Sequence, residues 1–347
     1  MKNKIGVVGY FAEGISKAGG QEAKTCFFTQ AIENVFPEEK VMRVDTLNWK
    51  KKPFKLFFQS IKLARNCKNV IILPAQNGVR IFVPFFLLLR CFLNFRLDYV
   101  VVGGWLPEMI KKHAFLSFIA KKLNGIYVES DIMKKSLENQ GFNNVYVLPN
   151  FKFLTPVEKD EIESVCSQPY KLCTFSRIMK EKGIEDAINA VKTFNEKQGT
   201  TVFQLDIYGK IDDGYRERFK NLEAGFMPYI KYCGEVKPDE SVDVLKNYFA
   251  LLFPTYYEGE GFAGTILDAF FSGLPVIATN WRYNSEIIKD NYTGYVYDYR
   301  DENGLITILE NIFKNPVKIK EMRYNCIEET KKYSPENAIK VVVENLC

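Results

Sequence analysis

Two carboxylates around a glycine-rich turn are the residues of this chain best suited to chemistry. Glu260 lies in an acidic, glycine-containing loop, and Asp268 follows it with seven residues between them. Residues 264–271 are expected to form a short helix, ended by Gly273 and Pro275 because glycine suits the left-handed C-terminal position and proline cannot continue a helix. Unpaired amides and the helix dipole make such a helix start favourable for phosphate. The amides concerned are those of Gly264, Thr265 and Ile266.

A phosphate site with a carboxylate on either side predicts binding of a sugar nucleotide. Its diphosphate would take the amides, and its hydroxyls would take the carboxylates of Glu260 and Asp268. The alternative interpretation is a helix whose acids only cap it.

Two cations behind another predicted strand are also placed for phosphate chemistry. Residues 171–175 form a short apolar run, and residues 184–194 show helical periodicity, with Arg177 and Lys182 between them. Departure of a nucleoside diphosphate builds negative charge on phosphate oxygens, and fixed cations stabilise that charge in the transition state. A guanidinium suits bidentate phosphate contact and a lysine acts as a point charge. The alternative interpretation is a solvated basic loop.

Both segments resemble the family-four retaining glycosyltransferases, which have the GT-B fold. The family's E-x7-E motif, inside EGFG…LEAMA.G.PVIA, matches residues 260–278 in order and spacing, with Asp268 in place of the second Glu. Its G-R-L-x-x-x-K-G turn matches residues 176–183, with Ser176 in place of the usual Gly.

The resemblance implies a role for each matching residue. Glu260 would contact the transferred sugar, Arg177 and Lys182 would bind the donor diphosphate, and these three form the expected catalytic set. Asp268 would contact the ribose. The expected donor-binding residues are Asp268, Gly264, Thr265, Ile266, Phe262, Gly19, Gly20 and Ser176. Because Arg177 and Lys182 are expected to line an open cleft, replacing either should reduce turnover and leave folding stability almost unchanged.

Gly19 and Gly20 belong to a glycine-punctuated loop after the first predicted strand, residues 5–10. They resemble the family's glycine pair and would let the backbone approach the donor phosphate ahead of a helix expected from Gln21. The loop is not a G-x-G-x-x-G fingerprint, and an ordinary turn is the alternative.

Strands and helices are expected to alternate along the chain, which predicts parallel sheets covered by helices on both faces. Further strands are predicted at 70–73, 99–102, 125–129, 145–148, 203–208, 230–233, 251–254, 276–278 and 295–297. A chain of 347 residues is too long for one ordinary core, so two domains are expected. With the resemblance, this gives an α/β protein of the GT-B fold, in which two doubly wound Rossmann-like domains face each other across a cleft.

The domain boundary is expected in the polar, acidic stretch 155–170, which prolines bracket. An N-terminal acceptor-binding domain is predicted over residues 1–155 and a C-terminal donor-binding domain over residues 156–333. The resemblance suggests that a last helix, at about 334–347, packs back on the first domain.

The first half of the chain is strongly basic. Residues 1–150 hold 22 Lys and Arg against 11 Asp and Glu, whereas the remainder holds 25 against 31. An interleaved run of cations and aromatic residues consists of Trp49, Lys50, Lys51, Lys52, Lys55, Phe57 and Phe58. Such a run is typical of an amphipathic surface that lies on anionic lipid headgroups. The alternative is a core helix with solvated lysines.

An apolar block at residues 82–93 is too short to span a bilayer and is expected to be a buried or interface-dipping helix. We favour peripheral membrane contact by the first domain, on the inner face of the cytoplasmic membrane. That location suits an acceptor carried on polyprenyl diphosphate.

Composition disfavours metal-dependent chemistry. The eight cysteines include no C-x-x-C pair and the chain has a single His, so we expect reduced thiols in a cytoplasmic protein and no zinc site. The Asp-x-Asp clamp for a nucleotide-bound Mg²⁺ or Mn²⁺ is missing from the sequence. His113 is expected on a surface helix and not as a base. We therefore expect no metal and no cofactor.

The sequence thus predicts a retaining, metal-independent transferase that moves a hexose-type sugar from a nucleotide-diphosphate sugar to a saccharide acceptor. The acceptor would be lipid-linked, in capsule, O-antigen or exopolysaccharide biosynthesis, and no nucleic-acid partner is expected. One alternative is a GT-B-related sugar-nucleotide epimerase, which would need acids and histidines facing inward in the first domain and is disfavoured by the lone His113. The other is a degenerate, non-catalytic binding protein, which Asp268 and Ser176 suggest.

Overall fold

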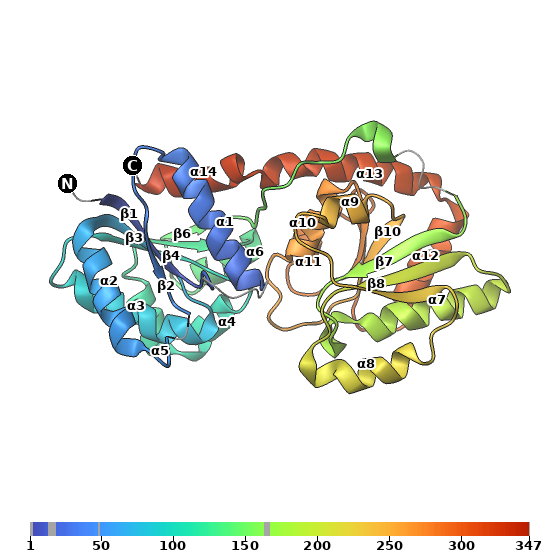
Figure 1. Ribbon diagram of the computed structural model, residues 1–347, viewed down its shortest axis with the longest axis horizontal. Coiled ribbons are helices and arrows are strands. Elements are labelled where there is room, and N and C mark those ends of the chain that lie inside the picture. The colour runs from blue at the N-terminus through green and yellow to red at the C-terminus, as the bar shows by residue number, and fades with distance from the viewer. Residues whose placement is uncertain (1–2, 13–18, 48, 163–166, 347) are drawn as a thin grey trace. The chain divides into compact units, whose positions relative to one another are not determined.

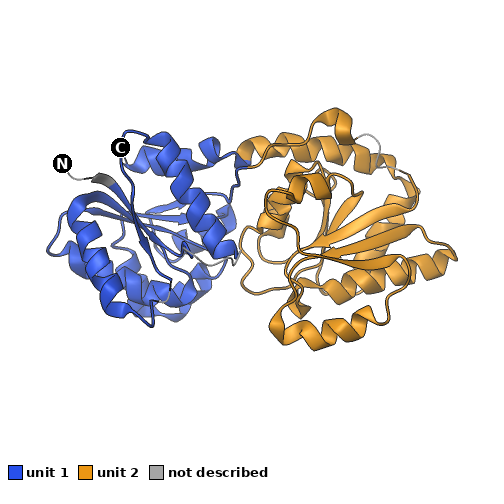
Figure 2. Cartoon of the chain, in the orientation of Figure 1, with its two compact units in different colours: residues 1–153, 333–347 blue, residues 154–332 orange. Residues whose placement is uncertain are grey.

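The computed structural model describes residues 3–12, 19–47, 49–162 and 167–346 (Figure 1). The chain forms two compact units, which consist of residues 1–153 with 333–347 and of residues 154–332 (Figure 2). Each unit is built on one six-stranded sheet in which every paired strand is parallel. The predicted α/β class with two Rossmann-like units is therefore confirmed.

Unit 1 carries strands in the order β2-β1-β3-β4-β5-β6. Their bounds are β1 Asn3–Gly9, β2 Met42–Asp45, β3 Cys67–Leu73, β4 Arg96–Val100, β5 Gly125–Val128 and β6 Val145–Val147. Four consecutive side chains of β3, Val70 to Leu73, are fully buried. Such a run marks a strand covered on both faces, as in a parallel sheet.

The helices of unit 1 are α1 Gly20–Val35, α2 Pro53–Asn66, α3 Gln76–Arg90, α4 Leu106–Lys112, α5 Ala114–Ala120, α6 Asp131–Glu138 and α14 Pro335–Leu346. The last of these, α14, lies beside α1 (Figure 1). Its Ala338, Ile339 and Val342 are buried in one apolar cluster with Phe28 and Ile32 of α1. The end of the chain thus completes the core of unit 1.

Two details of unit 1 differ from the sequence prediction. Strand β2 was not predicted, because it is a short edge strand in which only Val44 is buried and no apolar run marks it. His113 does not lie inside a helix: it is the exposed residue between α4 and α5, and its Nε2 lies 2.7 Å from Nη2 of Arg80.

Unit 2 carries strands in the order β12-β11-β10-β7-β8-β9. Their bounds are β7 Tyr170–Phe175, β8 Phe203–Tyr208, β9 Ile230–Gly234, β10 Ala250–Phe253, β11 Val276–Thr279 and β12 Gly294–Tyr297. The helices are α7 Ile184–Gln198, α8 Arg216–Glu223, α9 Ser241–Leu245, α10 Gly264–Phe271, α11 Asn284–Ile287, α12 Gly304–Lys314 and α13 Val317–Glu329. Short 3-10 helices are η1 Lys159–Ile162, η2 Lys180–Lys182, η3 Asp213–Tyr215 and η4 Thr330–Tyr333, the last at the boundary of the units. Strands predicted at 203–208 and 251–254 correspond to β8 and β10.

Candidate active site

The strand order of unit 2 reverses at β7, the first strand of the unit. The chain adds β8 and β9 on one side of β7 and β10 to β12 on the other. In open α/β sheets such a reversal leaves a crevice at the carboxyl ends of the strands, where ligands bind. The segment that follows β7 contains Arg177 and Lys182, and the segment that follows β10 contains Glu260. The fold therefore brings two separate sequence motifs to one edge of the sheet.

The two segments are held together by close backbone contacts. Gly183 has φ +69°, and a Cβ at this position would lie 2.1 Å from the carbonyl oxygen of Pro254. Only glycine fits such a left-handed, crowded position without a shift of the backbone. Beside it, the amide of Tyr256 donates to the carbonyl of Glu181 at 2.8 Å.

Lys182 and Glu260, both predicted site residues, form a buried ion pair. Nζ of Lys182 lies 2.5 Å from Oε2 of Glu260, and the two side chains are 10% and 9% exposed. The Thr255 hydroxyl lies 3.1 Å from the same carboxylate oxygen. Lys182 was expected to line an open cleft, and its burial contradicts that expectation. Removing one partner of a buried pair leaves an uncompensated charge, which strongly destabilises a protein.

Arg177 is the accessible cation of the site. Its side chain is 49% exposed, and Nη1 lies 3.6 Å from Oδ2 of Asp212. That distance is long for a charge-assisted hydrogen bond, so the guanidinium is only loosely engaged. Ser176, which precedes it, is half-buried, and its carbonyl oxygen would lie 1.8 Å from a Cβ at Gly209.

Tyr257 lies next to both cations, and sequence reasoning did not single it out. Its ring centroid is 5.1 Å from Nζ of Lys182 and 6.0 Å from the guanidinium carbon of Arg177. The indole of Trp281 donates to the Tyr257 carbonyl at 2.8 Å. A Cβ at Gly259 would lie 2.6 Å from the ring, so a glycine there makes room for it. An aromatic ring within about 6 Å of two cations gives each a cation–π contact.

Helix α10 begins directly after the Glu260 loop and is fastened to the end of β7. The hydroxyl of Thr265 donates to the carbonyl of Phe175, the last residue of β7, at 2.5 Å. The amide of Ile266 donates to the Ala263 carbonyl at 3.0 Å, so its predicted availability for phosphate is wrong. Gly264 and Thr265 are half-buried at the helix start. The side chains of Phe262 and Ile266 are buried in the unit.

Asp268 lies one turn into α10, with its carboxylate inside the protein. It is 4% exposed, and Oδ1 accepts a hydrogen bond from the Ser241 hydroxyl at 2.9 Å. Ser241 is the first residue of α9, and sequence reasoning gave it no role. The second acid of the motif is therefore held by a contact 27 residues away in sequence.

A group of hydroxyls links the end of β8 with the residues that precede β10. The hydroxyls of Tyr208 and Tyr248 lie 2.7 Å apart, and that of Tyr248 donates to Oδ2 of Asp206 at 2.6 Å. Burial raises the pKa of Tyr208 to about 12, and burial also raises the pKa of Tyr248. Both phenols therefore stay protonated at neutral pH and act as hydrogen-bond donors or acceptors, not as bases.

The glycine pair predicted for the donor site lies in unit 1. Gly19 caps the start of α1 in an extended conformation, Gly20 is the first helical residue, and a Cβ at either would meet no atom within 4 Å. Residues 13–18 of the same loop lie outside the described residues. The open space at both glycines is compatible with backbone approach by a ligand.

The predicted basic surface lies on α2 and the segment before it. Lys50, Lys51, Lys52 and Lys55 are exposed, as are Phe57 and Phe58. Trp49 is half-buried, and its ring packs edge-on against Phe82 of α3 with centroids 6.1 Å apart. Among the described residues, no helix has the length and apolar character needed to cross a bilayer. The same residues contain no group of three His, Cys, Asp or Glu arranged to hold a metal ion.

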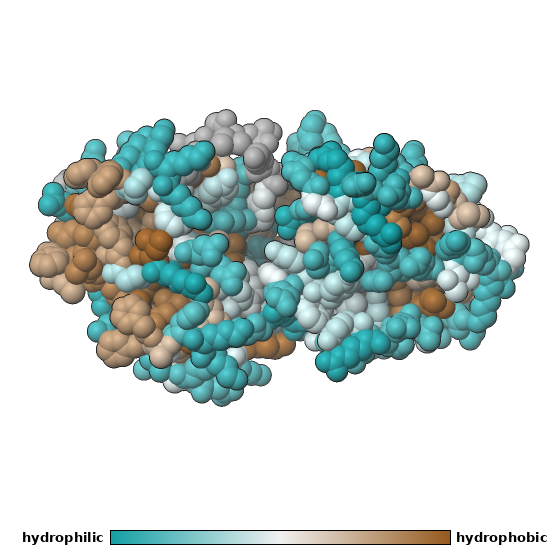
Figure 3. Space-filling view, turned by 90° about the horizontal axis from the view of Figure 1, so that it is seen from below, coloured by the Kyte–Doolittle hydropathy of each residue, from teal (hydrophilic) through white to brown (hydrophobic). Residues whose placement is uncertain are grey.

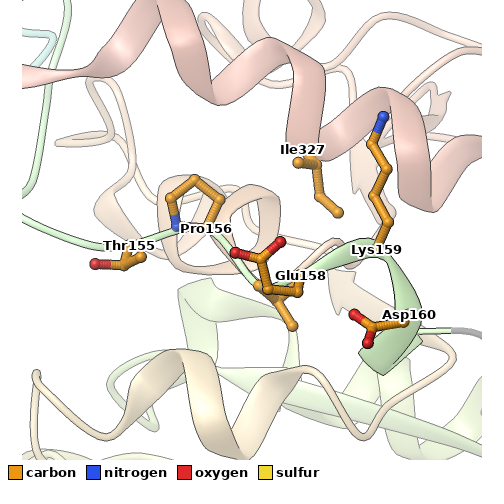
Figure 4. Close-up of a pocket in the computed structure, with 7 residues that line it drawn as sticks. Thr155, Pro156, Glu158, Lys159, Asp160 and Ile327 are labelled. Atoms are coloured by element: carbon orange, nitrogen blue, oxygen red, sulfur yellow. The ribbon is translucent and has the colours of Figure 1, made fainter.

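A surface pocket of 480 Å³ lies in unit 2 near the C-terminal end of α10 (Figure 4). Thr155, Pro156, Val157, Glu158, Lys159, Asp160 and Ile327 line it. Lys159 extends toward α13, where its Nζ lies 3.4 Å from the carboxylate of Glu328 (Figure 4). Its lining brings together none of the predicted site residues, so we do not assign it to the active site.

Two Rossmann-like units, each built on a parallel sheet, are the architecture of the GT-B class of fold. Residues 158–333 match the family Glycosyl transferases group 1, and the chain belongs to this family. The predicted family is thereby confirmed.

Known proteins support this assignment. The UDP-N-acetylglucosamine–peptide N-acetylglucosaminyltransferase GtfA subunit of Streptococcus gordonii is 29% identical over 181 residues, which cover 51% of this chain and 34% of that protein. An uncharacterised 41.2 kDa protein in the cps region of Klebsiella pneumoniae is 24% identical over 201 residues, or 56% of this chain and 53% of that protein. The chain thus spans about a third to a half of these relatives.

The fold is also seen in solved structures. Anabaena HepE, crystallised with UDP and glucose, superposes with a TM-score of 0.76 over 99% of both chains at 14% identity. This likeness confirms the predicted GT-B fold.

Proposed function

We propose that this chain is a retaining glycosyltransferase that moves a hexose-type sugar from a nucleotide-diphosphate sugar to a saccharide acceptor. The observation that carries the proposal is the buried Lys182–Glu260 pair at the β7 reversal, with Arg177 beside it. An opposite pair of charges at a ligand crevice offers a cation for phosphate and a carboxylate for sugar hydroxyls. Support also comes from HepE, a fold relative crystallised with UDP and glucose.

In the proposed reaction the bond between the sugar's anomeric carbon and the diphosphate oxygen breaks. A bond to the acceptor oxygen forms on the same face, and the acceptor proton passes to the departing phosphate. Arg177 and Lys182 stabilise the charge that develops on the phosphate, as preorganised donors do in other transfer reactions. We also propose a metal-independent reaction without a cofactor, because these two cations can supply the positive charge that the diphosphate requires.

Donor binding would exchange the partners of Lys182 and Glu260. Lys182 would turn its ammonium to the diphosphate, and Glu260 would accept hydrogen bonds from the transferred sugar. Asp268, fixed by Ser241, would bind the ribose. The start of α10, at Gly264 and Thr265, would add backbone donors for phosphate.

We place the enzyme in the cytoplasm, on the inner face of the cytoplasmic membrane, in capsule, O-antigen or exopolysaccharide assembly. The exposed lysines and phenylalanines of α2 support contact with an anionic membrane surface. Similarity to a protein encoded in a cps region supports a role in the assembly of such polysaccharides. The acceptor would then be a saccharide linked to polyprenyl diphosphate.

A screen of nucleotide sugars with the purified protein tests the proposal. We expect one donor to release its nucleoside diphosphate, with the sugar transferred in the same anomeric configuration, as read by NMR. Glu260→Gln should abolish transfer, whereas Glu310→Gln should not, because Glu310 forms an exposed pair with Lys197 on the surface. Release of an epimerised free sugar would refute the proposal and identify the protein as an epimerase. Nucleotide binding without release from any donor would identify a non-catalytic binding protein.

A further inference from the structure

Three helices of unit 1 expose apolar side chains along one side each. On α2 these are Phe54, Phe57 and Phe58, and on α5 they are Phe115 and Phe118. On α3, Ile81 and Leu88 are exposed, and Phe92 follows the helix end. Residues spaced by three, four or seven lie on one face of a helix, so each set forms a continuous stripe.

The three stripes belong to neighbouring helices. The rings of Phe57 on α2 and Phe85 on α3 lie 5.4 Å apart. Helices α3 and α5 contact each other, and Arg80 of α3 reaches His113 at the start of α5. Apolar side chains gather over this part of unit 1 in Figure 3, around the positions of α2, α3 and α5 in Figure 1.

Most of the surface of several of these side chains is exposed. Phe92 is 79% exposed, Phe115 is 70% exposed and Phe118 is 61% exposed, although their neighbours Leu116 and Ile119 are buried. Folding has therefore buried one side of α5 and left its aromatic side uncovered. Contiguous apolar patches of this kind mark sites of protein or membrane interaction.

The charges around the stripes indicate which kind of partner binds them. Between Trp49 and Lys122 the sequence carries 14 Lys or Arg and two acids, Asp98 and Glu108. Asp98 is buried and paired with Arg96, one of the 14, so the other 13 cations face Glu108 as the one remaining acid of this stretch. Just after α5, Nζ of Lys122 lies 4.5 Å from the Phe118 ring centroid, which places an ammonium at the edge of the stripe. Rings at the acyl boundary with lysines at headgroup level are the arrangement of interfacial helices.

We propose that α5 joins α2 and α3 in one docking surface for an anionic lipid bilayer, with Phe115 and Phe118 as inserting anchors. The inference deepens the membrane part of the proposed function and adds α5, to which the sequence analysis assigned no membrane contact. Vesicle binding needs neither donor nor acceptor, so its failure is separate from a failure of the transferase proposal.

Co-sedimentation of the full chain with vesicles tests the docking surface. The vesicles are phosphatidylcholine alone and phosphatidylcholine with phosphatidylglycerol. We expect binding to the anionic vesicles only, and a loss of at least about tenfold in Phe115→Ser/Phe118→Ser, because each ring would lose its burial in the acyl boundary. The matched control is Met227→Ser/Val317→Ser, which removes exposed apolar groups from unit 2 and should bind as the wild type does.

The reactivity of Cys91 allows a second test on the wild-type protein. It is exposed and lies in the sequence between Leu88 and Phe92 of the α3 stripe. Anionic vesicles should slow its reaction with a maleimide, followed by mass spectrometry, and neutral vesicles should not.

Several results would overturn the proposal. If the folded serine variant binds vesicles as well as the wild type does, α5 is not part of the docking surface. Equal binding to neutral vesicles would refute the charge argument. Loss of self-association in the serine variant, with no vesicle binding by the wild type, would make the same face a protein interface.

Discussion

Replacing Lys182 by Met should destabilise unit 2, because it leaves the Glu260 carboxylate buried without its cation. Both side chains are about nine-tenths inaccessible, and their charged atoms lie 2.5 Å apart. Breaking one partner of a buried pair costs about 3–5 kcal/mol. Thr255 still offers a hydroxyl to the carboxylate, so we expect the lower end, about 3 kcal/mol. Met places an uncharged side chain of similar length beside the rings of Phe253 and Tyr257, which Nζ of Lys182 approaches in the wild type.

Adding Glu260→Gln to Lys182→Met should recover most of that loss, because a neutral pair of similar volume costs little in the interior. The double-mutant cycle should thus give a coupling energy of about 2 kcal/mol or more. Urea unfolding can be followed by the fluorescence of Trp281, which contacts Tyr257, in a Trp49→Phe/Trp105→Phe background. Both variants should lose transfer, whatever their stability.

Lys197→Met is the control, since it breaks an exposed pair with Glu310 at 2.6 Å. Exposed pairs contribute less than about 1 kcal/mol, so its unfolding midpoint should move little. If Lys182→Met is as stable as this control, and Glu260→Gln adds nothing in the double variant, the pair is not a buried charge pair and the reasoning fails.

Three further predictions concern the same site. Arg177→Ala should lower turnover by about 10²–10³ with the urea midpoint unchanged, because the side chain is half exposed and loosely paired; near-normal steady-state kinetics would place the diphosphate elsewhere. Tyr257→Phe should keep activity and Tyr257→Leu should lose about tenfold or more, since the ring face and not the hydroxyl contacts the cations; equal rates for the two variants would exclude that role. Asp268→Asn should weaken nucleotide diphosphate binding in calorimetry more than it lowers turnover, and the reverse order would assign Asp268 to the sugar.

The sequence allowed prediction of the elements whose signals are local. Strand β11 and the end of α10 could be predicted because the apolar run 276–278 directly follows the Gly-Leu-Pro segment 273–275. Gly183 was part of a recognisable turn motif, and the structure adds the reason for it, which is the nearby Pro254 carbonyl. Strand β2 escaped prediction because one buried residue, Val44, gives no periodic signal.

Contacts between distant residues could not be predicted from local patterns. Lys182 and Glu260 are 78 residues apart, and they meet only because β7 pairs with β10, a strand that is not next in sequence. Tyr257 lies near Arg177 for the same reason, and Ser241 reaches Asp268 across 27 residues. Periodicity indicates which residues face a core, but it does not give the order in which strands pair.

The return of α14 to unit 1 has a consequence for the order of events during synthesis. Unit 2 is one continuous stretch, residues 154–332, whereas unit 1 receives α14 after that stretch. A ribosome therefore finishes all of unit 2 before the residues that cover Phe28 and Ile32 exist. Domains usually fold from the N-terminus as they emerge. Here the unit that begins first is completed last, and until α14 emerges its nascent form lacks the helix that packs against Phe28 and Ile32 of α1.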